Sequence, residues 1–266
     1  MNRPRGPIAL LTDFGTRDWY VAALKGVILS RATAVRLIDI THDIPPQDVI
    51  AGAFILAATV PWFPVGTIFL AVVDPGVGSH RHLLVARADG RYFIGPDNGL
   101  LALSLERATH ATVVRLTNPR YWLPSVSQTF HGRDVMAPVA AYLARGGTLA
   151  RLGEPVRRTQ SLALPTVQVQ THRLEGQVIH IDAFGNLITN MDLTRWYPGP
   201  QRHALRLRGY QRTIPMVSSY AEGRPGQLIA VEGSLGLVEL AVRKGSAARL
   251  VKARRGDRVS VLLPGA

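Results

Sequence analysis

Short apolar runs alternate with segments of helical periodicity through the first half of the chain. The runs have the length of buried strands and span residues 7–13, 35–40, 67–73, 83–88, 91–94 and 112–116. Helices are predicted from about residue 18 onward and over residues 47–60, 100–107 and 135–144. Asp89 and Gly90 indicate a hairpin between two of the strands. Strands that alternate with helices predict an α/β fold with a central, mostly parallel sheet.

The pattern changes between Pro155 and Pro165, where short β-type runs with turn signals begin. These runs cover residues 176–182, 187–190, 203–208, 227–232, 236–241 and 258–263, and no long helical pattern lies among them. We therefore expect an N-terminal α/β domain at residues 1–158 and a linker at about 159–165. A smaller all-β, barrel-like domain is expected at residues 166–266.

Composition narrows the class of protein. Hydrophobic residues make up 47% of the chain and charged residues 18%, as in globular proteins with a substantial core. Cysteine is absent, which excludes disulfides and cysteine-ligated metals. No window approaches the roughly 18 apolar residues of a membrane span, and the first apolar run is too short for a signal peptide. We expect a cytoplasmic protein that does not bind a membrane.

The net charge of +13 raises the question of an anionic partner. The arginines are scattered along the chain, and no zinc-finger or RNA-binding motif accompanies them. An arginine-rich composition explains the charge more simply, and we expect no nucleic-acid partner.

A carboxylate follows the most apolar of the strands. The run that ends at Val73 breaks into Asp74-Pro75-Gly76-Val77-Gly78-Ser79, in which the proline and the glycines favour tight turns. Ligands of open α/β sheets bind beyond the carboxyl ends of the strands. Asp74 is therefore placed for chemistry, and Arg81 could fold back to pair with it.

Two further polar clusters follow apolar segments and enter glycine-bearing loops, namely Asp13 with Asp18 and His131 with Arg133. A single acid at such a place is usually a helix cap or a turn former, and Asp134 is expected only to cap its helix. Arg133 is expected to pair with Asp134 or with another surface acid. Taken together, an Asp–Arg–His set suits the activation of a small nucleophile.

Other kinds of chemistry have weaker signals. No G-x-S-x-G motif or cysteine is present, which disfavours covalent catalysis. A metal hydrolase built from Asp13, Asp74, Asp97 and His131 remains an alternative, although no H-x-H or H-E-x-x-H spacing exists.

The second domain offers one turn with two interpretations. Asp182, Phe184 and Asn186 surround a glycine between two strand-like runs. They form either an ordinary hairpin turn or a platform on which Phe184 stacks against a base and Asn186 reads its edge. The glycine-flanked loop of residues 232–236 offers backbone donors. The spacing alone does not choose between these interpretations.

Six segments in order resemble the motifs of the S-adenosylmethionine hydroxide adenosyltransferases, relatives of the fluorinase and the chlorinase. They are LTDFGTRDWYV, DITHDIPPQDV, VVDPGVGS with Arg81, GPDNGLL, TFHGRDV and DAFGNLITN. The resemblance spans nearly the whole chain. It implies an α/β N-terminal domain and a β-barrel-like C-terminal domain. It also implies a homotrimer whose active sites lie between one subunit's N-terminal domain and its neighbour's C-terminal domain.

The resemblance further implies a reaction in which water, as hydroxide, attacks the 5′ carbon of S-adenosylmethionine and yields adenosine and L-methionine. The family's catalytic set falls on Asp74, Arg81 and His131, and its ribose-binding acid on Asp13. Implied contacts to the methionine end are Asp18, Tyr20, Asp182 and Ser234. Implied contacts to the adenine end are Phe184, Asn186 and the backbone near Val242 and Lys244, while Phe130 and Gln47 line the reaction pocket. No cofactor or metal is implied.

Departures from the halogenating relatives favour water as the nucleophile. Those enzymes lack the acid and the arginine that stand here as Asp74 and Arg81. The fluorinase has a serine where this chain has Gly132, whereas the chlorinase has a glycine there. Leu235 and Val242 stand where the halogenases have arginines. Three alternatives to the hydrolase remain: a halide-dependent, chlorinase-like adenosyl transferase, a metal-dependent phosphate ester hydrolase, and a non-enzymatic protein that binds adenosine or S-adenosylmethionine.

Overall fold

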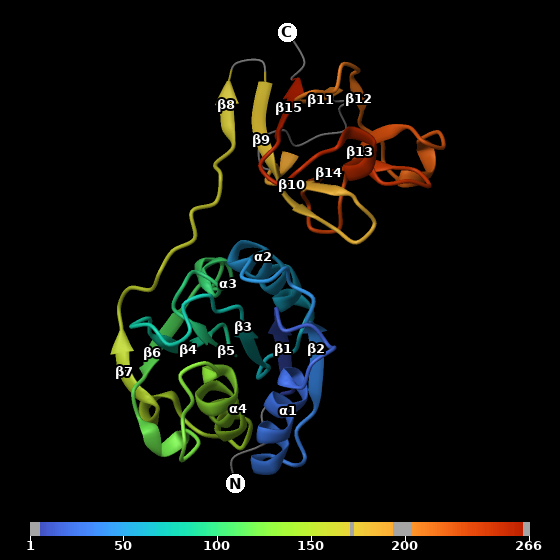
Figure 1. Ribbon diagram of the computed structural model, residues 1–266. Coiled ribbons are helices and arrows are strands. Elements are labelled where there is room, and N and C mark those ends of the chain that lie inside the picture. The colour runs from blue at the N-terminus through green and yellow to red at the C-terminus, as the bar shows by residue number, and fades with distance from the viewer. Residues whose placement is uncertain (1–5, 171–172, 194–203, 263–266) are drawn as a thin grey trace. The chain divides into compact units, whose positions relative to one another are not determined.

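The structure, a computed structural model, describes residues 6–170, 173–193 and 204–262. The chain divides into an N-terminal unit, residues 1–162, and a C-terminal unit, residues 163–266 (Figure 1). Within the described ranges, no helix is long and apolar enough to cross a membrane.

A seven-stranded mixed sheet forms the centre of the N-terminal unit. Its strands, in chain order, are β1 (Ile8–Thr12), β2 (Leu37–Thr41), β3 (Ile68–Val72), β4 (Leu83–Ala88), β5 (Arg91–Pro96), β6 (Ala111–Leu116) and β7 (Gly153–Val156). They lie in the order β2-β1-β3-β5-β4-β6-β7. The first four pair in parallel, and β4, β6 and β7 add antiparallel pairs. The predicted α/β class and mostly parallel centre are confirmed.

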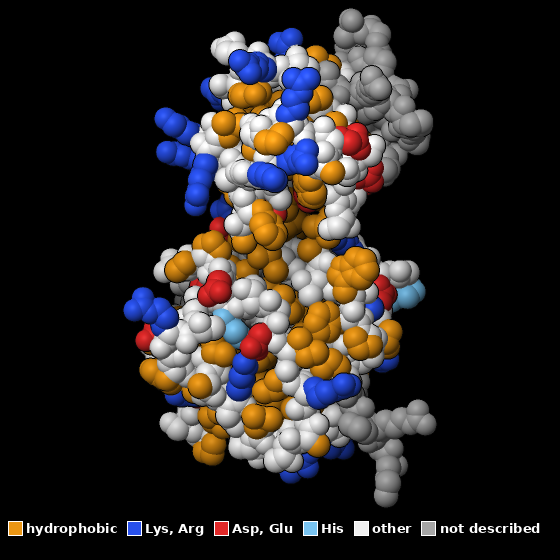
Figure 2. All heavy atoms as spheres, turned by 90° about the vertical axis from the view of Figure 1, so that its right-hand side faces the viewer, with side chains coloured by type: hydrophobic (Ala, Val, Ile, Leu, Met, Phe, Trp, Pro, Cys, Tyr) orange, Lys and Arg blue, Asp and Glu red, His pale blue; other side chains and the backbone are white. Residues whose placement is uncertain are grey.

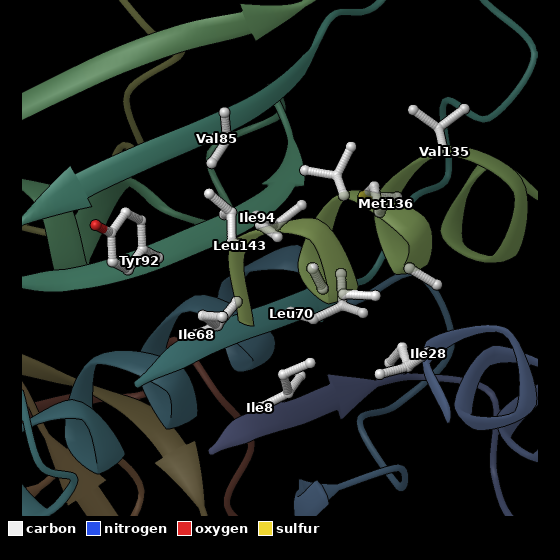
Figure 3. Close-up of a cluster of buried hydrophobic side chains, with 14 of the residues drawn as sticks. Ile8, Ile28, Ile68, Leu70, Val85, Tyr92, Ile94, Val135, Met136 and Leu143 are labelled. Atoms are coloured by element: carbon white, nitrogen blue, oxygen red, sulfur yellow. The ribbon is translucent and has the colours of Figure 1, made fainter. Parts of the chain in front are cut away.

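Helices cover both faces of this sheet because successive strand residues point to opposite sides. The helices are α1 (Tyr20–Arg31), α2 (Val49–Thr59), α3 (Ala102–Glu106) and α4 (Ala137–Ala144). On one face, Ile8 and Leu70 pack with Ile28 of α1 and Leu143 of α4, as Figure 3 shows. On the other face, strand residues such as Phe69 pack with α2. Loops follow the carboxyl ends of the parallel strands, between the helices that cover the two faces of the sheet.

Several details of the N-terminal unit differ from the prediction. The helix expected to begin at Val135 starts earlier, in a π-helical turn over Gly132–Met136 in which the Ala137 amide donates to the Gly132 carbonyl. Strand β7, which begins just before the segment where the pattern changes, was not predicted. Short 3-10 turns lie at Val60–Trp62, Pro119–Tyr121, Leu149–Arg151 and, in the C-terminal unit, Tyr220–Glu222. The Asp89–Gly90 hairpin is confirmed, with positive φ at both residues as a tight hairpin requires.

The C-terminal unit is an antiparallel sheet that nearly closes into a barrel. Its strands are β8 (Gln168–Gln170), β9 (Arg173–Ile181), β10 (Leu187–Thr189), β11 (Ala204–Leu207), β12 (Ile214–Pro215), β13 (Leu228–Glu232), β14 (Val238–Val242) and β15 (Arg258–Leu262), with one short helix, α6 (Ala247–Val251). They lie in the order β12-β11-β15-β9-β10-β14-β13, and β8 pairs with β9. A bridge between Met216 and Ala230 brings the segment after β12 beside β13.

The predicted all-β, barrel-like character of this unit is confirmed. Six of the strands overlap the predicted runs, whereas β8, β12 and α6 were not predicted. His203 and Leu263, expected as strand ends, lie outside the described residues. Alternating residues of the strands, such as Leu174, Val178 and Leu240, are buried and form the core.

Candidate functional site

Asp74 and Arg81 form a buried ion pair at the end of β3. Arg81 Nε lies 2.8 and 3.0 Å from the two carboxylate oxygens of Asp74, and Nη2 contacts Oδ2 as well. The loop between them can fold back because Gly78 has a φ of +80° and approaches the Gln128 carbonyl so closely that a Cβ would lie 2.9 Å from its oxygen. Asn98 fixes the start of the loop, since its amide donates to the Val73 carbonyl at 2.9 Å.

His131 completes this cluster from the loop before the π-helical turn. Arg81 Nη2 lies 3.0 Å from His131 Nδ1. A guanidinium only donates, so Nδ1 must accept this bond and the neutral ring carries its proton on Nε2. Burial lowers the pKa of His131, the positive charge of Arg81 lowers it further, and the negative charge of Asp74 opposes them. The pKa lies below its ordinary value, so the ring is a neutral donor at neutral pH.

Asp13 lies at the end of β1, next to β3 in the sheet. Its Oδ2 accepts a 2.8 Å hydrogen bond from the Gln47 backbone amide. Gln47 has a backbone φ of +66°, which residues other than glycine rarely adopt. Burial raises the pKa of Asp13, the Gln47 amide works against it, and the charge of Asp74 adds to the rise. Two acids and a histidine therefore meet beyond the carboxyl ends of neighbouring parallel strands.

A cavity of about 430 Å³ opens between these loops. Six of the residues singled out from the sequence line it, namely Asp13, Tyr20, Gln47, Asp74, Phe130 and His131. Arg81 contacts both Asp74 and His131, two residues of the lining. Asp18 is exposed just before α1 begins. The cavity is large enough for a small organic ligand.

An aromatic wall faces the cavity beside the polar cluster. Phe14, Tyr20 and Phe130 contact one another with ring centroids 5.3 to 5.9 Å apart. Trp19 stacks on Tyr20 at 4.5 Å, although it was not predicted to take part. Arg133 lies over the Phe130 ring and pairs with the buried Asp134 at 2.6 Å, so it is not a partner of His131. Asp134 does not cap its helix as expected, because it lies inside the π-helical turn and its carboxylate accepts from the Ser127 amide at 2.8 Å.

In the C-terminal unit, Asp182 organises the turn between β9 and β10. Its carboxylate accepts hydrogen bonds from the amides of Phe184 and Asn186, at 2.9 and 2.8 Å, and from the Asn186 side chain at 3.0 Å. Gly185, with a φ of +82°, packs against Ser246. The turn thereby presents Phe184 to solvent with 79% of its surface exposed. A large exposed ring on a rigid turn is suited to stack against a flat ligand.

The remaining predicted contacts lie around β14. Ser234 is exposed in the turn before it, Val242 is buried at its end, and Lys244 follows with a positive φ of 56°. Beneath this region, Glu239 accepts a 2.6 Å hydrogen bond from the Tyr220 hydroxyl, a pair that was not predicted because the residues are far apart in sequence. Burial raises the pKa of Tyr220 to about 12. The hydrogen bond to Glu239 and the negative charges of Glu239 and Asp182 contribute to this rise.

No three His, Asp or Glu side chains come together in a metal-binding arrangement anywhere in the described part of the chain. In the set considered above, Asp74 pairs with Arg81, and Asp97 instead accepts a 2.8 Å hydrogen bond from the Gln160 amide.

Comparisons with known proteins agree over nearly the whole chain. Residues 8–153 match the SAM hydroxide adenosyltransferase N-terminal domain, and residues 176–260 match the C-terminal domain of that family. The chain is 41% identical to the (R)-S-adenosyl-L-methionine hydrolase of Salinispora arenicola, over 96% of this chain and 97% of that protein. It is 37% identical to the protein of the same name from Thermus thermophilus, over 96% of this chain and 99% of that protein.

More distant likenesses point the same way. A fluorinase of an Actinoplanes species is 28% identical over 88% of this chain and 90% of that protein. The crystal structure of an uncharacterized conserved protein from Thermotoga maritima has a TM-score of 0.90 at 31% identity, and the match covers 96% of this chain and 99% of that one.

Proposed function

We propose that this chain, which belongs to the SAM hydroxide adenosyltransferase family, is an enzyme that hydrolyses S-adenosyl-L-methionine to adenosine and L-methionine. The observation that carries the proposal is the chain of contacts from Asp74 through Arg81 to His131, of which Asp74 and His131 line the cavity. The relatives named as hydrolases carry the (R) designation. We therefore expect the (R) epimer to be the substrate.

The reaction needs a placed nucleophile more than an acid. The sulfonium is already a good leaving group, so water attacks C5′ while the C5′–S bond breaks and its electron pair goes to the sulfur of methionine. One proton is released for each turnover. Holding water in line with the reacting carbon in a confined site is worth roughly 7–11 kcal/mol of the barrier.

The three residues have distinct tasks in this proposal. Asp74 keeps lone pairs after its bonds to Arg81, and it accepts a hydrogen bond from the attacking water and orients it. Arg81 and the Nε2–H of His131 stabilise the hydroxide that develops, since both are donors. Because Nδ1 of His131 is occupied by Arg81, the ring acts as a donor and not as the base.

The other predicted residues are assigned to the two ends of the substrate. Asp13 accepts from both ribose hydroxyls, with Gln47 and Phe130 lining the pocket. Asp18, Tyr20, Asp182 and Ser234 contact the methionine end, and Phe184, Asn186 and the backbone near Val242 and Lys244 contact the adenine end. The exposed ring of Phe184 supports this assignment.

We further propose a homotrimer, with each site completed by the C-terminal unit of a neighbouring subunit, in the cytoplasm and without cofactor, metal, nucleic acid or membrane. Exposed apolar side chains support assembly, because Trp19, Tyr20, Leu29 and Ile38 are all more than a third exposed. Figure 2 shows hydrophobic side chains gathered on this side of the N-terminal unit, where Figure 1 places α1 and β2.

One experiment separates the proposal from its alternatives. The protein is incubated with the separated (R) and (S) epimers of S-adenosyl-L-methionine in halide-free buffer with EDTA, and products are resolved by chromatography. Equimolar adenosine and methionine support the hydrolase. A product that appears only with added chloride would instead indicate an adenosyl transferase, activity only without EDTA a metal enzyme, and tight binding without turnover a binding protein.

A further inference from the structure

A buried histidine that has no part in the mechanism above joins the ends of two strands. His42 follows β2 and is 4% exposed, and its Nδ1 lies 2.8 Å from the hydroxyl of Thr12, the fully buried last residue of β1. Buried polar side chains are costly unless they are hydrogen-bonded, so this contact fixes both side chains.

Charged residues hold the other side of the ring. His42 Nε2 lies 3.1 Å from Asp39 Oδ1, although it is not aligned for a good hydrogen bond, and Lys25 of α1 lies 2.6 Å from Asp39 Oδ2. Burial works to raise the pKa of Asp39, but the contacts with Lys25 and His42 outweigh it and the pKa is lowered. We assign the ring proton to Nε2, toward the Asp39 carboxylate, so that Nδ1 accepts from the Thr12 hydroxyl.

The same histidine brackets Asp13. Thr12 Oγ1 accepts from the Phe14 amide at 3.3 Å, and the His42 carbonyl accepts from the Gly15 amide at 2.8 Å. The backbone of Asp13 is thus tied to His42 on both sides. The carboxylate of Asp13 accepts from the amide of Gln47, which lies five residues after His42 in the same loop.

We propose that His42 is a positioning residue that acts through Thr12 to aim the Asp13 carboxylate at the ribose hydroxyls of the substrate. This inference rests on the proposed function, since it takes Asp13 as the ribose-binding acid. A carboxylate that must meet two adjacent hydroxyls needs a fixed backbone, and small misplacements of such groups are expensive. His42 supplies that fixation from a buried position.

Ligands that differ only in the ribose hydroxyls test this assignment. Dissociation constants for adenosine and 2′,3′-dideoxyadenosine are measured by calorimetry for the full chain and its variants. In His42→Leu, adenosine should bind about tenfold more weakly, while dideoxyadenosine should change less than about twofold, as expected for losing bonds to a charged acceptor. His42→Asn, which can keep the contact to Thr12, should recover most of the loss.

Further variants keep the inference falsifiable. Asp13→Asn should show the same selective loss, and Asp13→Asn with His42→Leu should lose little more, because both act on one contact. If His42→Leu does not fold, Thr12→Val keeps the shape of Thr12 without its hydroxyl and should lose adenosine selectively. Equal losses for the two nucleosides, or none, would overturn the inference. A wild-type protein that binds neither nucleoside would instead overturn the proposed function.

Discussion

Asn in place of Asp74 keeps the shape of the side chain and removes the charge that faces Arg81. The pair is buried, with side-chain exposures of 6% for Asp74 and 9% for Arg81. Removing one partner of such a pair leaves an uncompensated charge, which typically costs about 3–5 kcal/mol of stability. Some of this should be recovered because the amide oxygen of Asn still accepts from Arg81.

Activity should fall further than stability implies. The amide no longer accepts from the water with a full charge, and it no longer aligns Arg81, which donates to the developing hydroxide. Losing one such donor typically costs about 10²–10³ in kcat. The charge of Asp74 also raises the pKa of His131 in the wild type. In Asp74→Asn, the charge of Arg81 is no longer opposed by this carboxylate, so the pKa of the ring falls further. The ring then stays neutral to lower pH, and whatever rate remains should persist to lower pH than in the wild type.

Adenosine release in halide-free buffer gives kcat and KM, and the thermal midpoint of the full chain reports stability. Glu154→Gln is the matched control, because it removes a carboxylate from the more exposed pair with Arg115, whose side chains are 35% exposed for Arg115 and 67% for Glu154. Such pairs contribute about 0–1 kcal/mol. If Asp74→Asn kept kcat within about threefold of the wild type while the control behaved as expected, the role assigned to this carboxylate would be refuted, because the loss expected for such a group is far larger.

Three other predictions concern pH, backbone shape and ring exposure. Because the pKa of His131 is lowered, kcat/KM should drop as pH falls below the ordinary imidazole value of about 6.5, and His131→Asn should flatten that limb of the profile. The stability contribution of the same group is present above about 6.5 and is lost as pH falls, because the unfolded chain takes up the proton first. Gly185→Ala should lower the free energy of unfolding in urea by more than about 2 kcal/mol, since φ is +82° and the new Cβ would lie 2.0 Å from Ser246 Oγ. Gly209→Ala shares that φ and meets nothing within 4 Å, so it measures the backbone cost alone, and equal effects of the two would contradict the packing argument. Phe184→Ala should leave the thermal midpoint nearly unchanged, because the ring is 79% exposed, and should raise KM for S-adenosyl-L-methionine by about 5–100-fold if the ring stacks on adenine; an unchanged KM would remove it from the site.

Local chemistry made much of the fold predictable. The Asp89–Gly90 turn sets its own hairpin because both residues tolerate positive φ, and the run before Asp74 is apolar enough to predict a buried strand. Strands without such signals were missed. β7 and β8 are short, lie at sheet edges and carry mostly exposed or half-buried residues, so no alternation marks them.

The site divides in the same way. Glycines and a strand end mark the loop of Asp74, and its pairing with Arg81 seven residues away could be proposed from the sequence. The contact of Arg81 with His131, fifty residues away, depends on the order of strands in the sheet. The Thr12–His42 and Tyr220–Glu239 contacts depend on tertiary packing in the same sense, and no local pattern announces them.

Charge neutrality is a consequence of how Arg81 is placed between Asp74 and His131. The carboxylate and the guanidinium cancel, and the ring is neutral, so the three groups together carry no net charge before the reactants arrive. On the proposed mechanism, the sulfonium brings one positive charge and the developing hydroxide one negative charge. The hydroxide loses its charge as the C5′–O bond forms, and the sulfur loses its charge as it takes the electron pair of the C5′–S bond. Once the proton given up by the attacking water has passed to solvent, adenosine and zwitterionic methionine leave a neutral cluster, so neither product is retained there by a net Coulombic attraction.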